Sequence, residues 1–251
     1  MPRCPVIKSS NLVKFLLLPL VINLALLVMY FSGNYWAQQV IAPTVNWLPE
    51  NSQREFGLIE ILQLLLLLKL VLICIGYLIT SQQWQIRAAY LVVIGGFSFI
   101  LLEEIDYGIH FYEIATHSNS GLEVRNWHNL GTGQGNRIFK SILDLVIFLW
   151  FFLLPLITPS MRAKSFSNFV PSRWFSVAVL TGFCVSRLAH QLEDLGFDVI
   201  NGVHGNLHKN ISEFRELNTY YLLVLYALTF KKLLPQIGWF RRSSDKPNAD
   251  S

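Results

Sequence analysis

The sequence predicts an all-α protein, a polytopic membrane helical bundle of about six transmembrane helices with both termini in the cytoplasm. Hydrophobic residues make up 53% of the chain, and the mean hydropathy is +0.42. Several apolar segments approach the ~20 residues needed to cross ~30 Å of hydrocarbon. Lysine and arginine are also unevenly divided between alternate loops, as the positive-inside rule describes.

The apolar segments define a single integral membrane domain over residues 1–242. The expected spans are residues 13–31, 57–79, 88–109, 139–158, 174–195 and 218–231. The first span follows basic residues, as a signal sequence does, but its end lacks an Ala-x-Ala cleavage site, so we expect an uncleaved anchor. Residues 243–251 are polar and are expected to form a disordered cytoplasmic tail.

Charge distribution sets the orientation. With six spans, the termini share one side with the loops at 80–87 and 159–173, and that side holds twelve lysines and arginines against six on the other. The positive-inside rule therefore places the termini in the cytoplasm, and we expect a bacterial inner (plasma) membrane protein. All six histidines and fourteen of the sixteen acids fall on the outer side. Any polar pocket should therefore face the periplasm.

Several classes of function are disfavoured by what the sequence lacks. Its three cysteines form neither a Cys-x-x-Cys motif nor a disulfide framework. No Gly-x-Ser-x-Gly elbow, phosphate-binding loop or His-Glu-x-x-His motif is present. Topology accounts for the basic residues, so nucleic acid is not an expected partner. The lipid bilayer is the expected partner, and the sequence does not identify a protein partner.

Ionisable residues cluster where the third span should leave the bilayer. The run is Glu103-Glu104-Ile105-Asp106-Tyr107-Gly108-Ile109-His110. A charge costs roughly 2.5 to 3.5 kcal/mol at the bilayer centre and less toward the edge, so such a cluster indicates a functional site. On a continuous helix, the 3-4-3 spacing places Glu103, Asp106, His110 and Glu113 on one stripe.

The fifth span carries a second stripe, formed by Arg187, His190 and Asp194. Glu103 and His190 each lie 16 residues above the cytoplasmic edge of their span, or ~24 Å at the helical rise. We therefore expect both stripes to face one shallow outer pocket. The candidate catalytic residues are Glu103, Glu104, Asp106 and His190, and the candidate metal ligands are His110, His128, His190, Asp194 and His208.

Histidine together with carboxylates suits a divalent metal such as Zn²⁺, Mn²⁺ or Fe²⁺, whereas carboxylates alone suit Ca²⁺. A metal-bound hydroxide could attack an ester, amide or phosphoester of a lipid, which predicts a membrane-embedded hydrolase or transferase. Without metal, one carboxylate could act as a general acid or base.

Other interpretations stay open. The charges could form only structural ion pairs, Arg187 with Glu104 and Lys69 with Glu60 or Asp144. The protein could also be a small transporter or an accessory subunit of a membrane complex.

Two short segments resemble each other. Asn126-Trp127-His128-Asn129-Leu130 follows the third span, and Asn206-Leu207-His208-Lys209-Asn210-Ile211 follows the fifth. The similarity indicates a weak repeat of a two-helix unit, in which His128 and His208 would cover the pocket from opposite sides.

Residues 103–108, Asn126-x-His128-Asn129 and Ser212-Glu213-Phe214-Arg215-Glu216 resemble motifs of a group of uncharacterised bacterial multi-pass membrane proteins. Asp106 and Tyr107 replace the usual Ser and Trp of that group. The resemblance implies that Glu103, Glu104 and His128 are functional. A distant analogy links the chain to alkaline-ceramidase-like membrane hydrolases, which hold zinc through histidines, although these have seven spans and a His-x-x-x-His pair in the last helix.

Overall fold

The computed structural model describes residues 9–45, 56–122, 134–157, 170–208 and 210–233. The regular secondary structure of these parts is helical apart from one small β-hairpin, which confirms the all-α prediction. The predicted tail at 243–251 and His128 lie outside the described residues.

Four helical segments are long and apolar enough to cross a membrane. The first, Ser9–Phe31, consists of α1 (Ser9–Leu12), the π-helical η1 (Val13–Leu17) and α2 (Leu18–Phe31). The others are α4 (Leu58–Thr80), α5 (Trp84–Glu104) and α9 (Arg173–Asp194). They correspond to the predicted first, second, third and fifth spans.

The other two predicted spans are also helical but less apolar or shorter. The fourth corresponds to α7 (Gln134–Ile147), the π-helical η5 (Phe148–Leu153) and α8 (Leu154–Ile157). The sixth lies within α10 (Glu213–Leu233), whose first turn is acidic. Each π-helical segment contains the residue that lies four positions before a proline. These residues are Phe15, before Pro19, and Phe151, before Pro155. Proline lacks an N–H and clashes with the carbonyl four residues earlier, which explains the wider turns.

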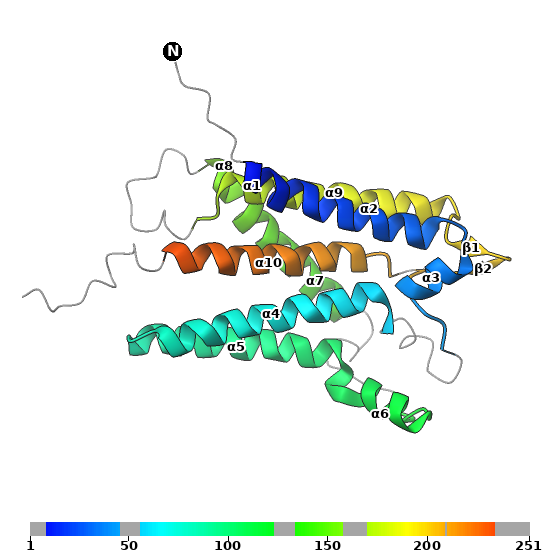
Figure 1. Ribbon diagram of the computed structural model, residues 1–251, viewed down its shortest axis with the longest axis horizontal. Coiled ribbons are helices and arrows are strands. Elements are labelled where there is room, and N and C mark those ends of the chain that lie inside the picture. Colours follow the sequence, from blue (N-terminus) through cyan, green and yellow to red (C-terminus); the bar gives the residue numbers. More distant parts are fainter. Residues whose placement is uncertain (1–8, 46–55, 123–133, 158–169, 209, 234–251) are drawn as a thin grey trace, which may run out of the picture.

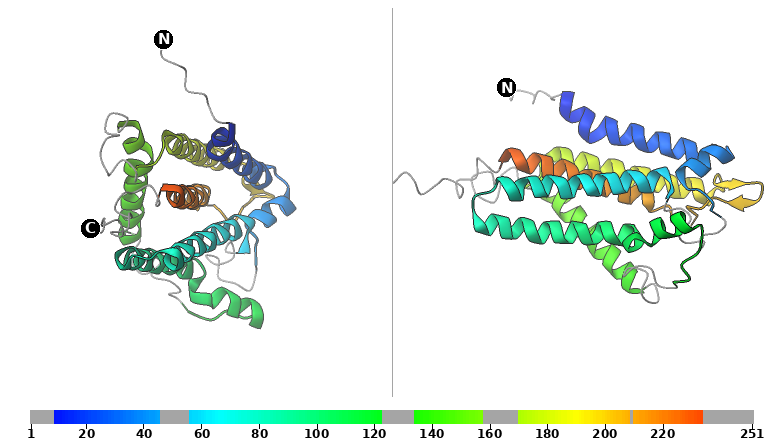
Figure 2. Two further views of the ribbon diagram at one scale, coloured as in Figure 1. Left: turned by 60° about the vertical axis from the view of Figure 1, so that its left-hand side comes forward. Right: turned by 60° about the horizontal axis from the view of Figure 1, so that its bottom comes forward.

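Helix α10 lies at the centre of the bundle. Figure 2 shows α2, α9, α4 and the α7–α8 segment around it. Gly182 on α9 permits a close approach, because a Cβ there would lie 3.1 Å from the Asn218 Cβ of α10. The Asn218 amide also exchanges hydrogen bonds of 3.0 and 3.2 Å with Asn23 of α2. A central position shields α10 from lipid, which fits its more polar sequence.

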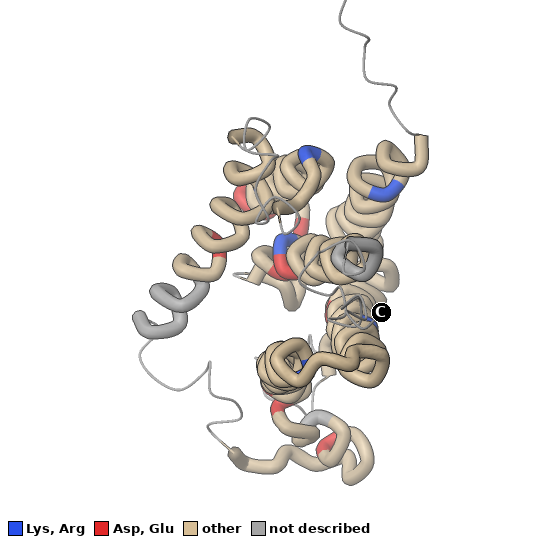
Figure 3. Tube along the Cα trace, turned by 90° about the vertical axis from the view of Figure 1, so that its left-hand side faces the viewer, with Lys and Arg blue, Asp and Glu red and all other residues tan. Residues whose placement is uncertain are grey.

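The two ends of the bundle differ. The described chain ends, Ser9 and Leu233, lie at one end together with the turn between α4 and α5 (Figure 1). The hairpin and α3 (Tyr35–Ile41) lie at the opposite end (Figure 1). Charged residues are sparse along the helices, so most of the trace in Figure 3 is tan.

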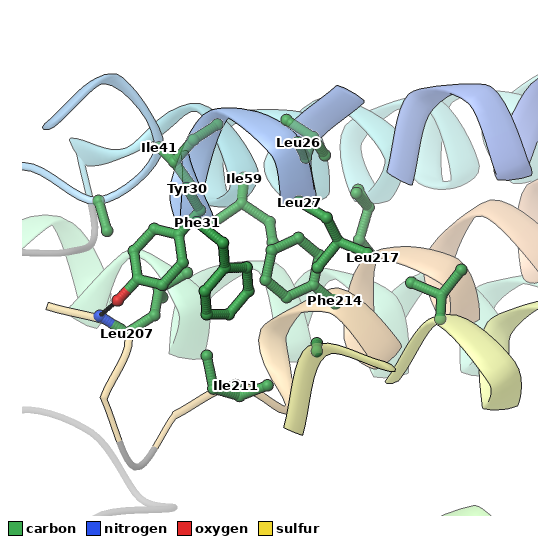
Figure 4. Close-up of a cluster of buried hydrophobic side chains, with 13 residues drawn as sticks. Leu26, Leu27, Tyr30, Phe31, Ile41, Ile59, Leu207, Ile211, Phe214 and Leu217 are labelled. Carbon is green, nitrogen blue, oxygen red and sulfur yellow. Dashed lines mark hydrogen bonds between the residues drawn. The ribbon is translucent and has the colours of Figure 1, made fainter. Parts of the chain in front are cut away.

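A hydrophobic cluster supports the hairpin end. It joins α2 and α4 to the segment before α10 through Leu26, Leu27, Tyr30, Phe31, Ile41, Ile59, Leu207, Ile211, Phe214 and Leu217 (Figure 4). The Tyr30 hydroxyl accepts a hydrogen bond of 3.0 Å from the Leu207 N–H. This buried bond fixes the loop that carries His208 to the core of the bundle.

The third predicted span, 88–109, was wrong at its outer end. Helix α5 stops at Glu104 and is followed by the 3₁₀ helix η3 (Asp106–Gly108) and by α6 (Ile109–Thr116). Asp106, Tyr107 and Gly108 have φ of 46°, 53° and 90°. Glycine and aspartate tolerate this left-handed region, and a continuous helix cannot pass through it. The predicted continuous stripe of Glu103, Asp106, His110 and Glu113 is therefore not formed.

Candidate metal centre

A tight β-hairpin positions the candidate site. Strands β1 (Val199–Ile200) and β2 (Val203–His204) are antiparallel, with Val199 opposite His204. Asn201 and Gly202 at the turn have φ of 53° and 81°, the left-handed pair that two-residue hairpins favour. The hairpin thus brings Asp198, which precedes β1, close to His204 in β2.

The hairpin is docked on α2 and α3 through its backbone. The Asp198 carbonyl accepts hydrogen bonds from the Gly205 N–H at 3.1 Å and from Gln38 Nε2 at 2.8 Å. A Cβ on Gly205 would lie 2.5 Å from the Tyr30 hydroxyl and 2.6 Å from Gln38 Nε2. No other residue fits at position 205 without moving this contact.

Three side chains converge at this end of the bundle. Nδ1 of His204 lies 2.8 Å from Asp198 Oδ2, and Nδ1 of His208 lies 3.6 Å from the same oxygen. The two imidazole rings are stacked with centroids 3.9 Å apart. One ligand atom from each residue lies within 4.8 Å of the others, close enough to hold a metal ion.

The carboxylate of Asp198 is the most buried part of the group. Its side chain has 0% exposure, and Oδ1 has no hydrogen-bond partner among the described residues. A buried carboxylate oxygen without a partner is costly. A divalent metal held by this carboxylate and the imidazoles would offset the cost of burying its negative charge.

Glu193 extends the group on its α9 side. Its carboxylate lies 3.2 Å from His208 Nδ1 and 3.6 Å from His190 Nδ1. The Nδ1 atom of His208 is buried and makes no hydrogen bond of good geometry within the described parts. His204 and His208 keep side-chain exposures of 47% and 33%. The Asp198 side of the site is therefore buried, and the imidazole side is accessible to solvent.

Nitrogen and oxygen ligands of this kind suit Zn²⁺ and other divalent transition metals. With Asp198, His204 and His208 as three protein ligands, a further coordination position would remain for water or substrate. An open position of this type is typical of catalytic rather than structural zinc sites.

The structure places two of the predicted metal ligands in or beside this group, His208 as a possible ligand and His190 through Glu193. Asp194 and Arg187 are exposed. The predicted interior position of the Arg187–His190–Asp194 stripe was therefore wrong. Small residues, including Ala178, Gly182, Ser186 and Ala189, occupy the buried face of α9 instead, because they allow close packing.

The predicted carboxylates of the third span lie elsewhere. Helix α5 packs on α4, and α10 lies between this pair and α9 (Figure 2). Glu104 accepts a hydrogen bond of 2.7 Å from the Tyr220 hydroxyl of α10. Glu103 and Asp106 are buried near the end of α5. The predicted single pocket, lined by both stripes, is not formed, because α10 separates them.

Glu103 interacts locally. It accepts a hydrogen bond from the Tyr107 hydroxyl, and this bond raises the pKa of the tyrosine above its ordinary value. The bond helps to hold Tyr107 in its left-handed conformation. The side chain of His110 and all of His128 lie outside the described residues.

The ion pairs expected for Lys69 and Arg187 are not found among the described residues. Lys69 and Arg187 are exposed, and Asp144 instead lies 2.9 Å from Arg215 of α10. The Asp144–Arg215 ion pair follows from the fold, because α7 passes beside the first turns of α10.

Two members of the group, Asp198 and His204, escaped prediction from the sequence. Both lie outside the apolar segments, where helical spacing does not relate one side chain to another. The signal that could have found them is His204-Gly205-Asn206-Leu207-His208, a pair of histidines four residues apart in a turn-rich segment after an aspartate.

Comparison with known proteins does not identify a relative. No family model, curated protein or solved structure matches the chain significantly. The resemblance of residues 103–108 to other membrane proteins therefore stays a prediction, and so does the analogy to alkaline ceramidases.

Proposed function

We propose that this chain is a six-span inner-membrane metalloprotein that acts as a hydrolase or transferase on a lipid at the periplasmic surface. Both termini are cytoplasmic in this proposal, and Asp198, His204 and His208 hold a divalent metal, with Zn²⁺ the best match. Four helices that are long and apolar enough to cross a membrane support the membrane location.

The observation that carries the metal proposal is the environment of Asp198. Its fully buried carboxylate has one oxygen facing two imidazoles and the other without a hydrogen bond in the described part of the chain. An ion pair with His204 alone would not explain why a second imidazole stacks on the first and faces the same carboxylate oxygen. One metal ion accounts for all three side chains.

Apolar side chains around the group support a lipid substrate. Leu195, Phe197 and Val203 are 73%, 51% and 69% exposed, and they flank Asp198 and His204 in sequence. Exposed apolar residues at the end of membrane-spanning helices favour insertion into the headgroup and acyl boundary. The metal would then lie at the level of lipid ester and phosphoester bonds.

The chemistry follows from the ligand set. A bound divalent metal lowers the pKa of its water toward ~7 and polarises an ester or phosphoester oxygen. Glu193 would orient His208 and is close enough to accept a proton at the site. His190, 3.6 Å from Glu193, would pass that proton to the exposed surface.

Reconstitution in lipid vesicles tests the proposal. Wild-type protein with Zn²⁺ in vesicles of bacterial phospholipids should release lipid products that mass spectrometry detects, and a chelator should stop the release. The His204→Ala variant should be inactive, while Asp194→Asn, which changes an exposed residue nearby, should keep its activity. The absence of lipid products from zinc-loaded wild type, or equal activity of His204→Ala, would contradict the proposal.

A further inference from the structure

Two basic side chains lie on outward faces of the long apolar helices, where a membrane would surround them. Lys69 of α4 and Arg187 of α9 are both exposed, and neither side chain makes a hydrogen bond or ion pair within the described parts of the chain. A charge at membrane depth is costly, so such residues normally face a protein interior or pair with an acid. Neither residue belongs to the group around Asp198, and the proposed lipid chemistry does not use them.

Depth in the membrane distinguishes the two residues. Arg187 lies seven residues before Asp194, the end of α9, so its long side chain can snorkel over most of the ~10 Å that remain at the helical rise. Lys69 lies eleven residues from both ends of α4, Leu58 and Thr80, or ~16 Å from either end. A lysine stem of five bonds, each of about 1.5 Å, reaches about 6 Å, so its ammonium cannot extend to either surface. Lys69 therefore needs an anion inside the membrane.

The face of α4 beside Lys69 has the residue spacing of a helix-packing seam. Its outward apolar residues are 44% to 70% exposed, and they are Ile61, Leu65, Leu68, Leu72 and Ile79. With the partly buried Ile75 included, the spacing is 4-3-4-3-4. This is the a/d heptad pattern of helices that pack side by side. We call these six apolar residues, together with Lys69, the α4 seam.

Lys69 occupies a position of this heptad that contacts a facing helix. Leu68 is a d residue, so Lys69 is the following e residue, and charged side chains at e positions form ion pairs that set the choice of partner. Helices α10 and α5, which pack on α4 (Figure 2), leave this face exposed. Leucine and isoleucine alone would be stable against lipid, so the lysine is the residue that indicates a protein partner.

A second copy of this chain does not supply the missing anion. Two copies inserted in the same membrane have parallel α4 helices, and an e residue of one then faces a g residue of the other. The g residues nearest Lys69 in the heptad are Leu64 and Val71, which carry no charge. Glu60, the acid of α4, is buried within its own chain. The anion must therefore come from another membrane protein.

We propose that the α4 seam docks a transmembrane helix of another membrane protein, and that this helix carries an aspartate or glutamate at mid-membrane depth that pairs with Lys69. The leucines and isoleucines of the seam supply close packing. The ion pair supplies specificity, because a partner without the acid would leave the lysine charge buried and unpaired. This docking site is independent of the proposed metal centre and of its reaction.

Binding of a designed helix to the purified full-length chain in vesicles tests this proposal. The probe is a synthetic leucine-rich transmembrane peptide of the length of α4 with one glutamate at its centre, and the control peptide has glutamine there. Energy transfer between labelled peptide and labelled protein measures binding in phosphatidylcholine, whose headgroups carry no net charge. Wild-type protein should bind the glutamate peptide at least about tenfold more tightly than the glutamine peptide.

Variants separate the ion pair from a loss of folding. Lys69→Leu should bind both peptides equally, and Arg187→Leu should keep the wild-type preference. Lys69→Glu should prefer a peptide with a central lysine, a gain of binding that requires folded protein. Equal binding of both peptides by wild type, or an undiminished preference in Lys69→Leu, would overturn the proposal. Energy transfer between two labelled wild-type copies that Lys69→Leu abolishes would also overturn it, because a second copy would then occupy the seam.

Discussion

The hairpin group (Asp198, His204 and His208) and the acidic end of α5 (Glu103, Glu104 and Asp106) differ in the type of side chain and in access to solvent. The hairpin group combines one buried carboxylate with two partly exposed imidazoles. At the acidic end of α5, Glu103 and Asp106 are almost fully buried, and tyrosine hydroxyls donate hydrogen bonds to Glu103 and Glu104. The difference teaches that side chains on a loop at the end of the bundle suit exchange and catalysis, whereas buried carboxylates that bond neighbouring helical segments suit a structural role.

The largest effect on zinc affinity is expected when the hairpin group loses the carboxylate that both imidazoles share. Asp198→Asn should lower zinc affinity by at least about 100-fold, because it removes the one charged ligand that faces both imidazoles. Competition with a zinc-sensitive dye measures the change. Asp194→Asn is the matched control and should bind zinc as wild type does. Equal affinity of the two variants would remove Asp198 from the site.

The second prediction concerns the backbone that holds the hairpin. Gly205→Ala should lower the free energy of unfolding by about 1 to 3 kcal/mol, because the new methyl group overlaps the Tyr30 hydroxyl and the Gln38 amide. It should also weaken zinc binding. Thermal unfolding in detergent and a zinc titration check this. Gly202→Ala lies at the open turn and serves to measure backbone strain alone.

The Tyr30 hydroxyl should matter next. Tyr30→Phe leaves the buried Leu207 N–H without an acceptor, so the free energy of unfolding should fall by roughly 1 to 3 kcal/mol. Tyr35→Phe, at an exposed tyrosine, should change it by less than about 0.5 kcal/mol. If both variants unfold at the wild-type temperature, the hairpin is not held by this bond.

The smallest expected effect is that of pH on zinc affinity. Imidazoles must be neutral to coordinate a metal, so protons compete with zinc and affinity should fall as pH is lowered. The direction of this pH dependence follows from the proposed ligands, since zinc and protons would compete for the same imidazole nitrogens of His204 and His208. Zinc titration at a series of pH values measures the slope, and a slope of zero would exclude the imidazoles as ligands.

The helical architecture could be predicted from the sequence because apolar length and charge asymmetry are properties of segments. Membrane location follows from runs such as 58–80, which need no tertiary information. The break after Glu104 was missed because apolar residues on both sides continue the pattern, and only backbone angles at Asp106 to Gly108 show it.

The site was predicted only in part. His208 was predicted from the likeness of its loop to Asn126–Leu130, and His190, which lies beside the group, was predicted from the charged stripe of the fifth span. Asp198 and His204 were missed because a hairpin with its turn at Asn201-Gly202, and not a helical period, brings them together. The expected meeting of Glu103 with His190 failed because equal depth does not make two helices neighbours, and α10 lies between them.

Metal content measured on the purified protein tests the central claim most directly. After dialysis against Zn²⁺ and removal of excess metal, elemental analysis should find about one zinc per wild-type chain and almost none in the folded His204→Ala/His208→Ala variant. Wild-type protein without zinc, or a double variant that retains it, would contradict the metal centre.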